Sequence, residues 1–148
     1  MTPSEAMTVA LREASLATDH ADVPVGAVIL DAAGTVVAVG HNERELTGDP
    51  TAHAEVVAIR RAAEALGTWR LEGCTLVVTL EPCTMCAGAI VLSRLAQVVY
   101  GAVDDKAGAA GSRWDVLRDR RLNHRPEVLA GVRADECGAL LTEFFRRP

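Results

Sequence analysis

The chain contains two short motifs whose side chains are good zinc ligands. His53 lies two residues before Glu55, and further along the chain Cys83 and Cys86 follow Pro82. One imidazole and two thiols make three protein ligands, whereas a closed structural zinc site has four and a catalytic site leaves one position for water. The carboxylate of Glu55 is suited to take and return the protons of that water. Together the motifs predict a catalytic zinc site with His53, Cys83 and Cys86 as ligands and Glu55 as the catalytic acid and base.

Each motif has a simpler interpretation when it is taken alone. Two cysteines with two residues between them also occur in structural zinc half-sites and in redox-active pairs, and a histidine near a glutamate usually has no chemical role. Redox chemistry needs no histidine upstream, however. A structural site needs a fourth ligand, and we expect His20, His41 and His124 to be hydrogen-bonding residues of the surface or core. The combination of the two motifs therefore favours the catalytic site.

The composition is that of an ordinary globular protein. The chain has 148 residues, of which 49% are hydrophobic and 24% charged, and this predicts one domain over residues 1–148. No apolar run approaches the ~18 residues of a membrane helix, and the first ten residues lack the basic region of a signal peptide. Four cysteines, two of them spaced as a metal pair, do not suggest a disulfide framework. We expect a protein of the reducing cytoplasm.

Charge is distributed unevenly along the chain. The whole chain has a net charge of −5, but residues 1–74 carry 5 basic and 11 acidic side chains, a net of −6, and residues 75–148 carry 10 and 9, a net of +1. A locally basic surface can bind phosphates on an acidic protein. A solvated surface without a ligand is the simpler interpretation of the charge alone. The arginines near the end are Arg113, Arg118, Arg120, Arg121, Arg125, Arg133, Arg146 and Arg147.

Hydrophobic periodicity places the motifs in an α/β fold. It predicts helices over 4–18, 50–66, 83–94, 114–120 and 133–147, and strands over 25–30, 35–39, 74–80, 97–103 and 127–129. Residues 40–51 and 104–112 are predicted loops. This order predicts a mixed sheet of five strands with helices on both faces.

Some details of the predicted helices bear on the site. Pro50 is assigned to the first helical position, where its missing N–H costs nothing. Both groups of ligands then open helices, whose free N–H groups and dipole favour a thiolate. The residues predicted to face inward are Val56, Ile59, Ala63 and Leu66 in one helix and Cys137, Leu140, Leu141 and Phe144 in the last.

Longer stretches of the sequence resemble the bacterial tRNA-specific adenosine deaminases, within the cytidine and deoxycytidylate deaminase superfamily. The resemblance runs from about residue 23 to residue 145. Three matching stretches are 23–28, 49–55 and 79–90, of which the last also resembles bacterial guanine deaminases. The stretches 104–112, 123–124 and 144–146 are more specifically similar to the tRNA enzymes.

The resemblance implies a cytidine-deaminase-like fold, which is a three-layer α/β/α sandwich with a five-stranded mixed sheet. It implies one zinc per subunit and a homodimer. It also implies conversion of adenosine to inosine at the wobble position of a tRNA anticodon, chiefly in an arginine tRNA, so the expected partner is an anticodon stem-loop. Asn42 occupies the place of an asparagine that contacts the flipped base, and Val25 and Ala54 are the other implied substrate contacts. A turn-forming asparagine is the alternative for Asn42.

The resemblance further implies contacts to the rest of the RNA. Asp104 and Lys106 would line its path, and Phe145 would stack on an extruded base beside Arg146. The alternatives are solvated turn residues for the first two and a core position for Phe145. The family's basic tail is longer than the two residues that follow Arg146 here.

Two rival functions stay open. One is a free nucleobase deaminase of the same superfamily, such as a guanine deaminase, which would act without RNA. The other is a zinc-stabilised RNA-binding module without turnover. Glu55 argues against the second, because a purely structural site has no use for a carboxylate that is not a ligand.

Overall fold

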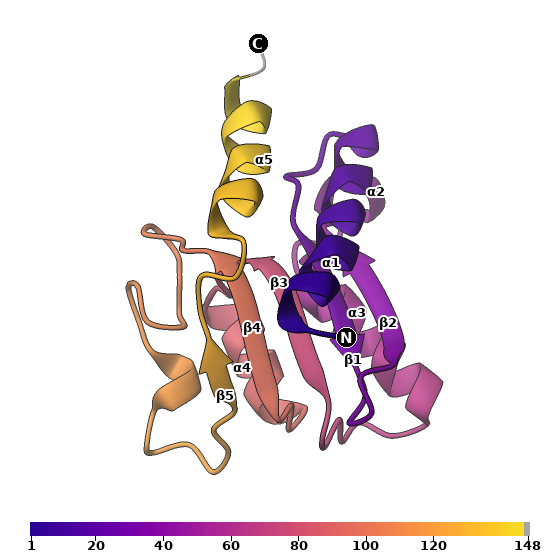
Figure 1. Ribbon diagram of the computed structural model, residues 1–148, viewed down its shortest axis with the longest axis vertical. Coiled ribbons are helices and arrows are strands. Elements are labelled where there is room, and N and C mark those ends of the chain that lie inside the picture. The colour runs from indigo at the N-terminus through magenta and orange to yellow at the C-terminus, as the bar shows by residue number, and fades with distance from the viewer. Residues whose placement is uncertain (147–148) are drawn as a thin grey trace.

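The computed structural model describes residues 1–146, which form one mixed five-stranded sheet between two layers of helices (Figure 1). The strand order is β2-β1-β3-β4-β5. Strand β1 (Gly26–Leu30) pairs antiparallel with β2 (Val36–His41) and with β3 (Thr75–Leu80). Strands β4 (Gln97–Ala102) and β5 (Glu127–Leu129) continue the sheet in parallel. This confirms the predicted fold class.

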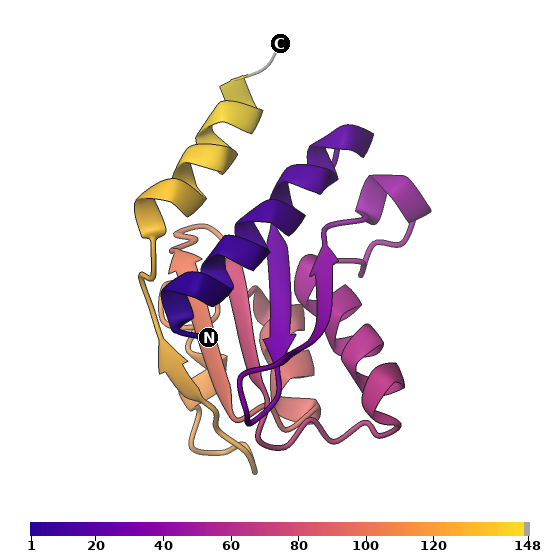
Figure 2. The same ribbon diagram turned by 45° about the vertical axis from the view of Figure 1, so that its right-hand side comes forward.

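Two pairs of helices cover the two faces of the sheet. Helices α1 (Pro3–Ala17) and α5 (Ala134–Arg146) lie on one face, and α3 (Ala54–Leu66) and α4 (Thr84–Leu92) lie on the other (Figures 1 and 2). The molecule is therefore the α/β/α sandwich that the sequence predicted. Within residues 1–146 no helix is both long and apolar enough to cross a lipid bilayer.

The central strands supply side chains to both faces of the sheet. Ile29, Leu76 and Val98 are buried with α3 and α4, whereas Val28 and Val77, their neighbours in sequence, are buried with α1. Successive side chains of a strand point to opposite faces. A strand buried on both faces needs apolar residues at nearly every position, which explains why these strands appear in the sequence as continuous hydrophobic runs.

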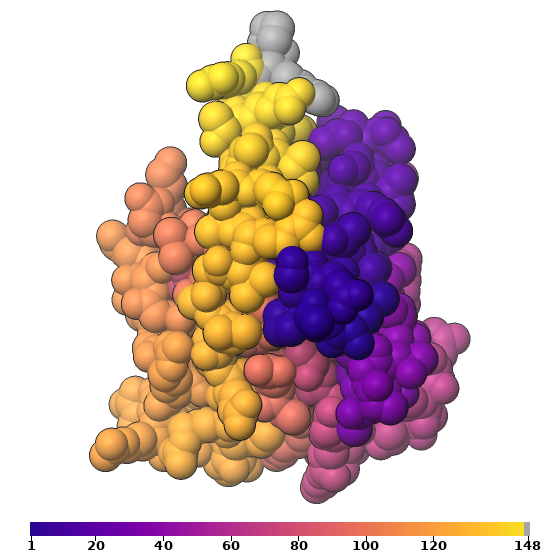
Figure 3. All heavy atoms as spheres, in the orientation of Figure 1, coloured from indigo at the N-terminus to yellow at the C-terminus, as the bar shows by residue number. Residues whose placement is uncertain are grey.

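Helix α5 is anchored at its start and then projects beyond the ends of the strands (Figure 2), so that its yellow atoms reach one end of the molecule in the space-filling view (Figure 3). It begins after Arg133, whose φ of 54° is not helical, and the Arg133 guanidinium donates hydrogen bonds to Ser4 and Thr8 of α1. Of the four residues predicted to face inward, Cys137 is buried and the other three are half-buried. Arg147, the last residue of the predicted helix, lies outside the described residues. The half-buried residues are Leu140, Leu141 and Phe144.

The predicted start of the helix at Pro50 is wrong. Helix α3 begins at Ala54, four residues later, because the Asp49 side chain accepts hydrogen bonds from the N–H and the hydroxyl of Thr51 at 2.8 and 2.7 Å. These bonds fold the chain into a turn in place of a first helical turn. The predicted loop before it also contains a short helix, α2 (Arg44–Thr47).

Two further details differ from the sequence prediction. Leu66 was predicted to face inward, but it is the last residue of α3 and is 44% exposed. The predicted helix over residues 114–120 is only a 3-10 turn, Val116–Arg118. Neither difference affects the positions of the predicted zinc ligands.

Gly40 in β2 sets how closely α3 approaches the sheet. A Cβ atom at this position would lie 2.8 Å from both the Ala54 oxygen and the Ala58 nitrogen of α3. We expect Gly40→Ala to push the start of α3 outward and to lower the free energy of unfolding by ~1–3 kcal/mol, the usual cost of overpacking. Chemical denaturation would measure this, and Gly138→Ala, where a Cβ meets nothing within 4 Å, is the matched control. Equal effects of the two variants would contradict the prediction.

Candidate active site

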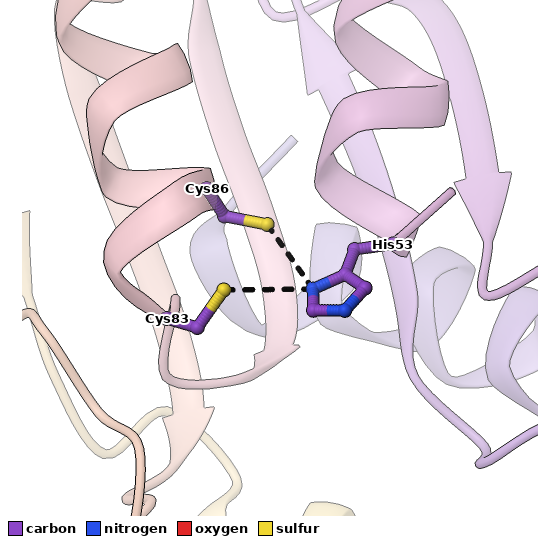
Figure 4. A group of neighbouring side chains, drawn as sticks. All are labelled: His53, Cys83 and Cys86. Atoms are coloured by element: carbon purple, nitrogen blue, oxygen red, sulfur yellow. Dashed lines mark hydrogen bonds between the residues drawn. The ribbon is translucent and has the colours of Figure 1, made fainter. Parts of the chain in front are cut away.

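Three side chains from distant parts of the sequence meet where α3 and α4 begin (Figure 4). The Nδ1 atom of His53 lies 3.5 Å from the Sγ atom of Cys83 and 3.5 Å from that of Cys86. The candidate ligand atoms all lie within 4.8 Å of one another. The structure thus brings together the three residues that the sequence predicted as zinc ligands.

The way the two helices start explains why these side chains meet. His53 is the N-cap residue of α3 and Cys83 is that of α4, and both have extended backbone, with ψ of 154° and 178°. Neither side chain forms a capping hydrogen bond to its own helix. Each is therefore free to point across the gap between the helices. Cys86 follows in the first turn of α4, on the face it shares with Cys83.

The spacing of the three atoms fits a tetrahedral zinc ion. With Zn–N bonds of ~2.0–2.1 Å and Zn–S bonds of ~2.3 Å, nitrogen and sulfur ligands are about 3.6 Å apart, and the two separations here are 3.5 Å. An imidazole with two thiols is also a donor set typical of zinc. Among residues 1–146 the group offers three ligands, as catalytic zinc sites do.

The electrostatics of the group also favour a cation. A hydrogen bond with Cys86, assisted by one with His53, lowers the pKa of Cys83 to about 4. The same contact raises the pKa of Cys86, because the two sulfur atoms compete for one proton. The hydrogen bond with Cys83 also raises the pKa of His53. The group thus carries a thiolate at neutral pH, and a bound dication would favour loss of the remaining protons.

Glu55 lies beside the three ligands in the first turn of α3 and is only 4% exposed. Burial raises the pKa of its carboxyl group to about 7, although the neighbouring His53 acts in the opposite direction. A group with a pKa near the working pH can both accept and donate a proton. Two residues that are two apart within a helix point to different sides. His53 is the N-cap residue and lies outside the helix, so its side chain can still lie near that of Glu55.

A cavity of about 160 Å³ opens onto this group. It is lined by the three predicted substrate contacts, Val25, Asn42 and Ala54, and by Asp104, one of the predicted RNA contacts. Pockets for drug-sized ligands usually measure roughly 300–1,000 Å³, so this cavity suits a single base better than a whole nucleotide. The lining residues that the sequence analysis did not single out are Val23, Arg44, Leu80, Glu81 and Ala107.

Asn42 is held firmly in the cavity wall. Its side chain is almost buried, its Nδ2 atom donates to the Val23 carbonyl at 3.3 Å, and its Oδ1 atom accepts from the Arg44 N–H at 3.3 Å. The turn-forming role that the sequence left open is therefore present. Each end of an amide can make a second hydrogen bond, so the side chain keeps capacity for a ligand in the cavity.

The remaining predicted RNA contacts lie outside the cavity. Lys106 and Arg146 are exposed, and Phe145 is 69% exposed on α5, so it does not close the core. The Phe145 ring meets that of Phe144 edge-to-face, with centroids 5.3 Å apart. These side chains are accessible to a large ligand that extends beyond the cavity.

The other three histidines make hydrogen bonds away from the site, as predicted. His20 Nδ1 lies 2.6 Å from the Asp22 carboxylate, and His41 Nδ1 lies 3.1 Å from that of Glu13. His124 Nε2 lies 2.7 Å from the carbonyl oxygen of Leu95, a backbone partner.

Two buried carboxylates near the cavity were missed by the sequence analysis. Asp22 accepts hydrogen bonds from the N–H groups of Glu45 and Leu46, at 2.8 and 3.2 Å, and so holds α2 beside Asn42. Glu81 accepts hydrogen bonds from the segment 104–112. The backbone partners of each carboxylate lie at least 23 residues away in sequence, so no local pattern identifies these contacts.

Known proteins are similar to this chain in sequence and in fold. The family described as the cytidine and deoxycytidylate deaminase zinc-binding region matches residues 1–102, which include all three ligands and Glu55. A tRNA-specific adenosine deaminase of Bacillus subtilis is 51% identical over 140 residues, which are 95% of this chain and 86% of the relative.

Two solved structures, one from a study of tRNA deaminases and one of a guanine deaminase, can be compared with this chain. A structure from a study of A-to-I editing by tRNA:A34 deaminases has a TM-score of 0.89 and 43% identity, and the match covers 93% of this chain and 99% of that one. A guanine deaminase of Bacillus subtilis has a TM-score of 0.68 and 38% identity, and the match covers 79% and 74%. Of these two structures, the one from the tRNA:A34 deaminase study is more similar to this chain in identity, coverage and TM-score. The chain belongs to the cytidine and deoxycytidylate deaminase family, and within it to the tRNA-specific adenosine deaminases.

Proposed function

We propose that residues 1–148 act as one zinc-dependent deaminase domain that converts adenosine to inosine at the wobble position of a tRNA anticodon, chiefly in an arginine tRNA. The observation that carries this proposal is the buried Glu55 beside His53, Cys83 and Cys86, in the lining of a cavity of about 160 Å³. A base in a duplex or a loop must leave its stack to enter such a cavity.

In the proposed reaction water replaces the amino group of the purine, and ammonia leaves. His53, Cys83 and Cys86 would hold the zinc ion, one per subunit. When bound, zinc lowers the pKa of a coordinated water toward ~7 and so makes it a nucleophile at neutral pH. Glu55 accepts a proton from the attacking water and delivers protons to the ring nitrogen and to the departing amine. Its burial excludes bulk water from these transfers.

Asn42, Val25 and Ala54 would position the base. All three line the cavity, and Asn42 has one further N–H and one further lone pair to offer. This donor and acceptor pair suits the edge of a purine. Val25 and Ala54 supply apolar surface on which a flat ring can pack.

Asp104 would contact the RNA from the cavity wall, and the contacts outside the cavity would be Lys106, Phe145 and Arg146. The exposure of the last three supports this, because each can meet a bulky partner without a rearrangement of the core. Phe145 offers a face for stacking, and Lys106 and Arg146 offer positive charge for phosphates.

The same proposal includes a homodimer in the cytoplasm. Three large apolar side chains at or just after the ends of α3 and α4 are exposed: Leu66, Trp69 and Leu92, at 44%, 57% and 70%. Apolar surface left exposed in this way supports the proposed contact between subunits. The four cysteines are free thiols, which suits a reducing compartment. Sedimentation of the zinc-loaded protein at low concentration measures the assembly, and a monomer would contradict the dimer.

The test of the proposed function compares three substrates for one enzyme. Zinc-loaded protein is incubated with an anticodon stem-loop that carries adenosine at the wobble position, with free adenosine and with guanine. Mass spectrometry of the digested products should detect inosine in the stem-loop alone. The same stem-loop with its adenosine moved out of the wobble position is the control and should stay unmodified.

Other results of this three-substrate experiment would indicate other functions. Conversion of guanine to xanthine without RNA would indicate the free-base deaminase, and binding of the stem-loop without any conversion would indicate an RNA-binding module. RNA affinity should also fall as salt rises, because phosphate contacts release counterions. A flat salt response would argue against the basic second half as the docking surface.

Phe145 gives a separate test of the RNA contact. Stacking of a base on an aromatic ring is worth ~1–3 kcal/mol, so Phe145→Ala should raise the KM for the stem-loop by ~10-fold and change kcat by less than ~3-fold. Steady-state kinetics on the stem-loop measure both. Val36→Ala, which removes a 39% exposed side chain on β2, is the control. Equal KM values for the two variants would exclude Phe145 from the RNA surface.

A further inference from the structure

Glu81, one of the residues that line the cavity, is a buried carboxylate directly after β3 that accepts hydrogen bonds from a loop. It is 2% exposed and immediately precedes Pro82 and the ligand Cys83. Its Oε1 atom accepts a hydrogen bond from the Asp104 N–H at 3.0 Å, and its Oε2 atom accepts from the N–H groups of Ala110 and Ser112, each at 3.0 Å. The Ser112 hydroxyl also donates to Oε1. One carboxylate therefore binds both ends of the segment 104–112.

The negative charge of Glu81 is stabilised by hydrogen bonds from backbone N–H groups. Among residues 1–146 the carboxylate forms no ion pair with a basic side chain. Burial alone would raise the pKa of Glu81, but the hydrogen bonds from Ser112, Asp104 and Ala110 outweigh it and hold the pKa below its usual value. An ionised carboxylate can only accept hydrogen bonds, and hydrogen bonds to a charged group are the strong ones.

The segment is also packed against the carboxyl group. A Cβ atom at Gly108 would lie 2.4 Å from the Cδ atom of Glu81 and 2.4 Å from the Asp104 oxygen. The Ala109 N–H donates to the Pro82 carbonyl at 2.8 Å. The loop is thus tied to the Glu81 side chain and to the backbone of Pro82, the residue before the ligand Cys83.

The segment held in this way forms one wall of the cavity. Asp104 and Ala107 line it, as does Asn42. Asp104 is itself fixed, because its Oδ1 atom accepts from the N–H groups of Lys106 and Ala107 at 3.0 and 3.1 Å. The position of this wall therefore depends on the hydrogen bonds that Glu81 accepts.

We propose that Glu81 is a positioning residue that sets the shape of the wall formed by residues 104–112, and so determines how tightly the nucleotide to be deaminated is held. The proposal rests on the proposed function for the identity of the substrate. Glu81 contacts no reacting atom in this scheme. Its effect passes through the backbone of the segment, and in particular through Asp104 and Ala107.

The test is Glu81→Gln, which keeps the shape but puts an NH2 group where backbone N–H groups now donate. We expect one zinc per chain, a KM for the wobble-adenosine stem-loop raised by about tenfold or more, and kcat lowered by less than ~3-fold. Hydrogen exchange at the amides of Asp104, Ala110 and Ser112 should accelerate more than exchange in the central strands. Glu72→Gln, which changes a 62% exposed carboxylate, is the control and should alter none of these values.

Ser112→Ala provides a second variant should Glu81→Gln fail to fold. It removes one hydroxyl donor at a partly exposed place and should shift KM and loop exchange in the same direction by a smaller factor. Unchanged KM and unchanged loop exchange would overturn the proposal, as would loss of zinc or a fall in kcat at constant KM. If the unsubstituted protein does not convert the stem-loop at all, the proposed function fails. The exchange comparison still decides whether Glu81 holds the wall.

Discussion

Replacing Glu55 with alanine will leave zinc bound and lower kcat by at least ~100-fold, the loss expected when a general acid and base is removed. The three ligand atoms belong to other residues, so the metal site keeps its donors. The fold should also survive. Burial raises the pKa of Glu55 to about 7, which means that its ionised form costs folding free energy, so its removal does not take away a stabilising charge. Zinc analysis and steady-state kinetics on the wobble-adenosine stem-loop measure the two effects.

Glu55→Gln is the matched control for this experiment. It fills nearly the same buried volume but cannot take up a proton at neutral pH, so it should lose as much activity as the alanine variant. A glutamine variant with near-normal kcat would show that Glu55 fills space and does not transfer protons. Loss of zinc from either variant would mean that the carboxylate is part of the metal site, and the assigned role would then be wrong.

The zinc ligands could be predicted from the sequence because each motif stands at the start of a helix. A residue at the start of a helix projects its side chain beyond the helix end, and both motifs stand at such starts, His53 before α3 and Cys83 before α4. The continuous hydrophobic runs of β1, β3 and β4 then required a sheet buried on both faces. A sheet of this kind places successive helices side by side, which is what brings His53 to 3.5 Å from both sulfur atoms.

The errors of the sequence prediction arose where a side chain competed with the local backbone pattern. Pro50 is a good first residue for a helix, but the Asp49 carboxylate binds Thr51 and turns the chain first. Leu66 fits the apolar period of α3, yet the helix ends there at a left-handed Gly67 and leaves the side chain exposed. Periodicity describes which side of a helix a residue occupies, and it does not say whether another element covers that place.

The walls of the cavity could not be predicted, because distant residues hold them. Asp22 holds the helix α2 beside Asn42, and Glu81 holds the segment 104–112. Both carboxylates bond backbone N–H groups, which every residue except proline carries. Bonds to the backbone leave no trace in the residue types of these loops, and only the tertiary structure shows which loops the carboxylates organise.

Replacing Cys86 with alanine will remove zinc from the purified protein and abolish deamination. Only His53 and Cys83 of the ligand group would remain, and two protein ligands are fewer than structural or catalytic zinc sites use. Because zinc binds the folded protein, its loss also lowers stability: a ligand present at 1,000 times its Kd contributes about 4.1 kcal/mol to the free energy of unfolding. The variant should therefore unfold at a lower temperature than the zinc-loaded parent. Metal analysis and thermal unfolding would measure both changes.

Cys74→Ala separates loss of the metal from loss of a buried sulfur atom. Cys74 is also a free, buried thiol, 3% exposed, but it packs in the core and is not one of the three ligands. Its replacement should cost some packing energy and leave one zinc per chain. After treatment with a chelator, added zinc should raise the unfolding temperature of the parent and of Cys74→Ala but not that of Cys86→Ala. A Cys86→Ala protein that still gains stability from zinc would show that another side chain completes the site, and the assignment of a water to its fourth position would then have to be abandoned.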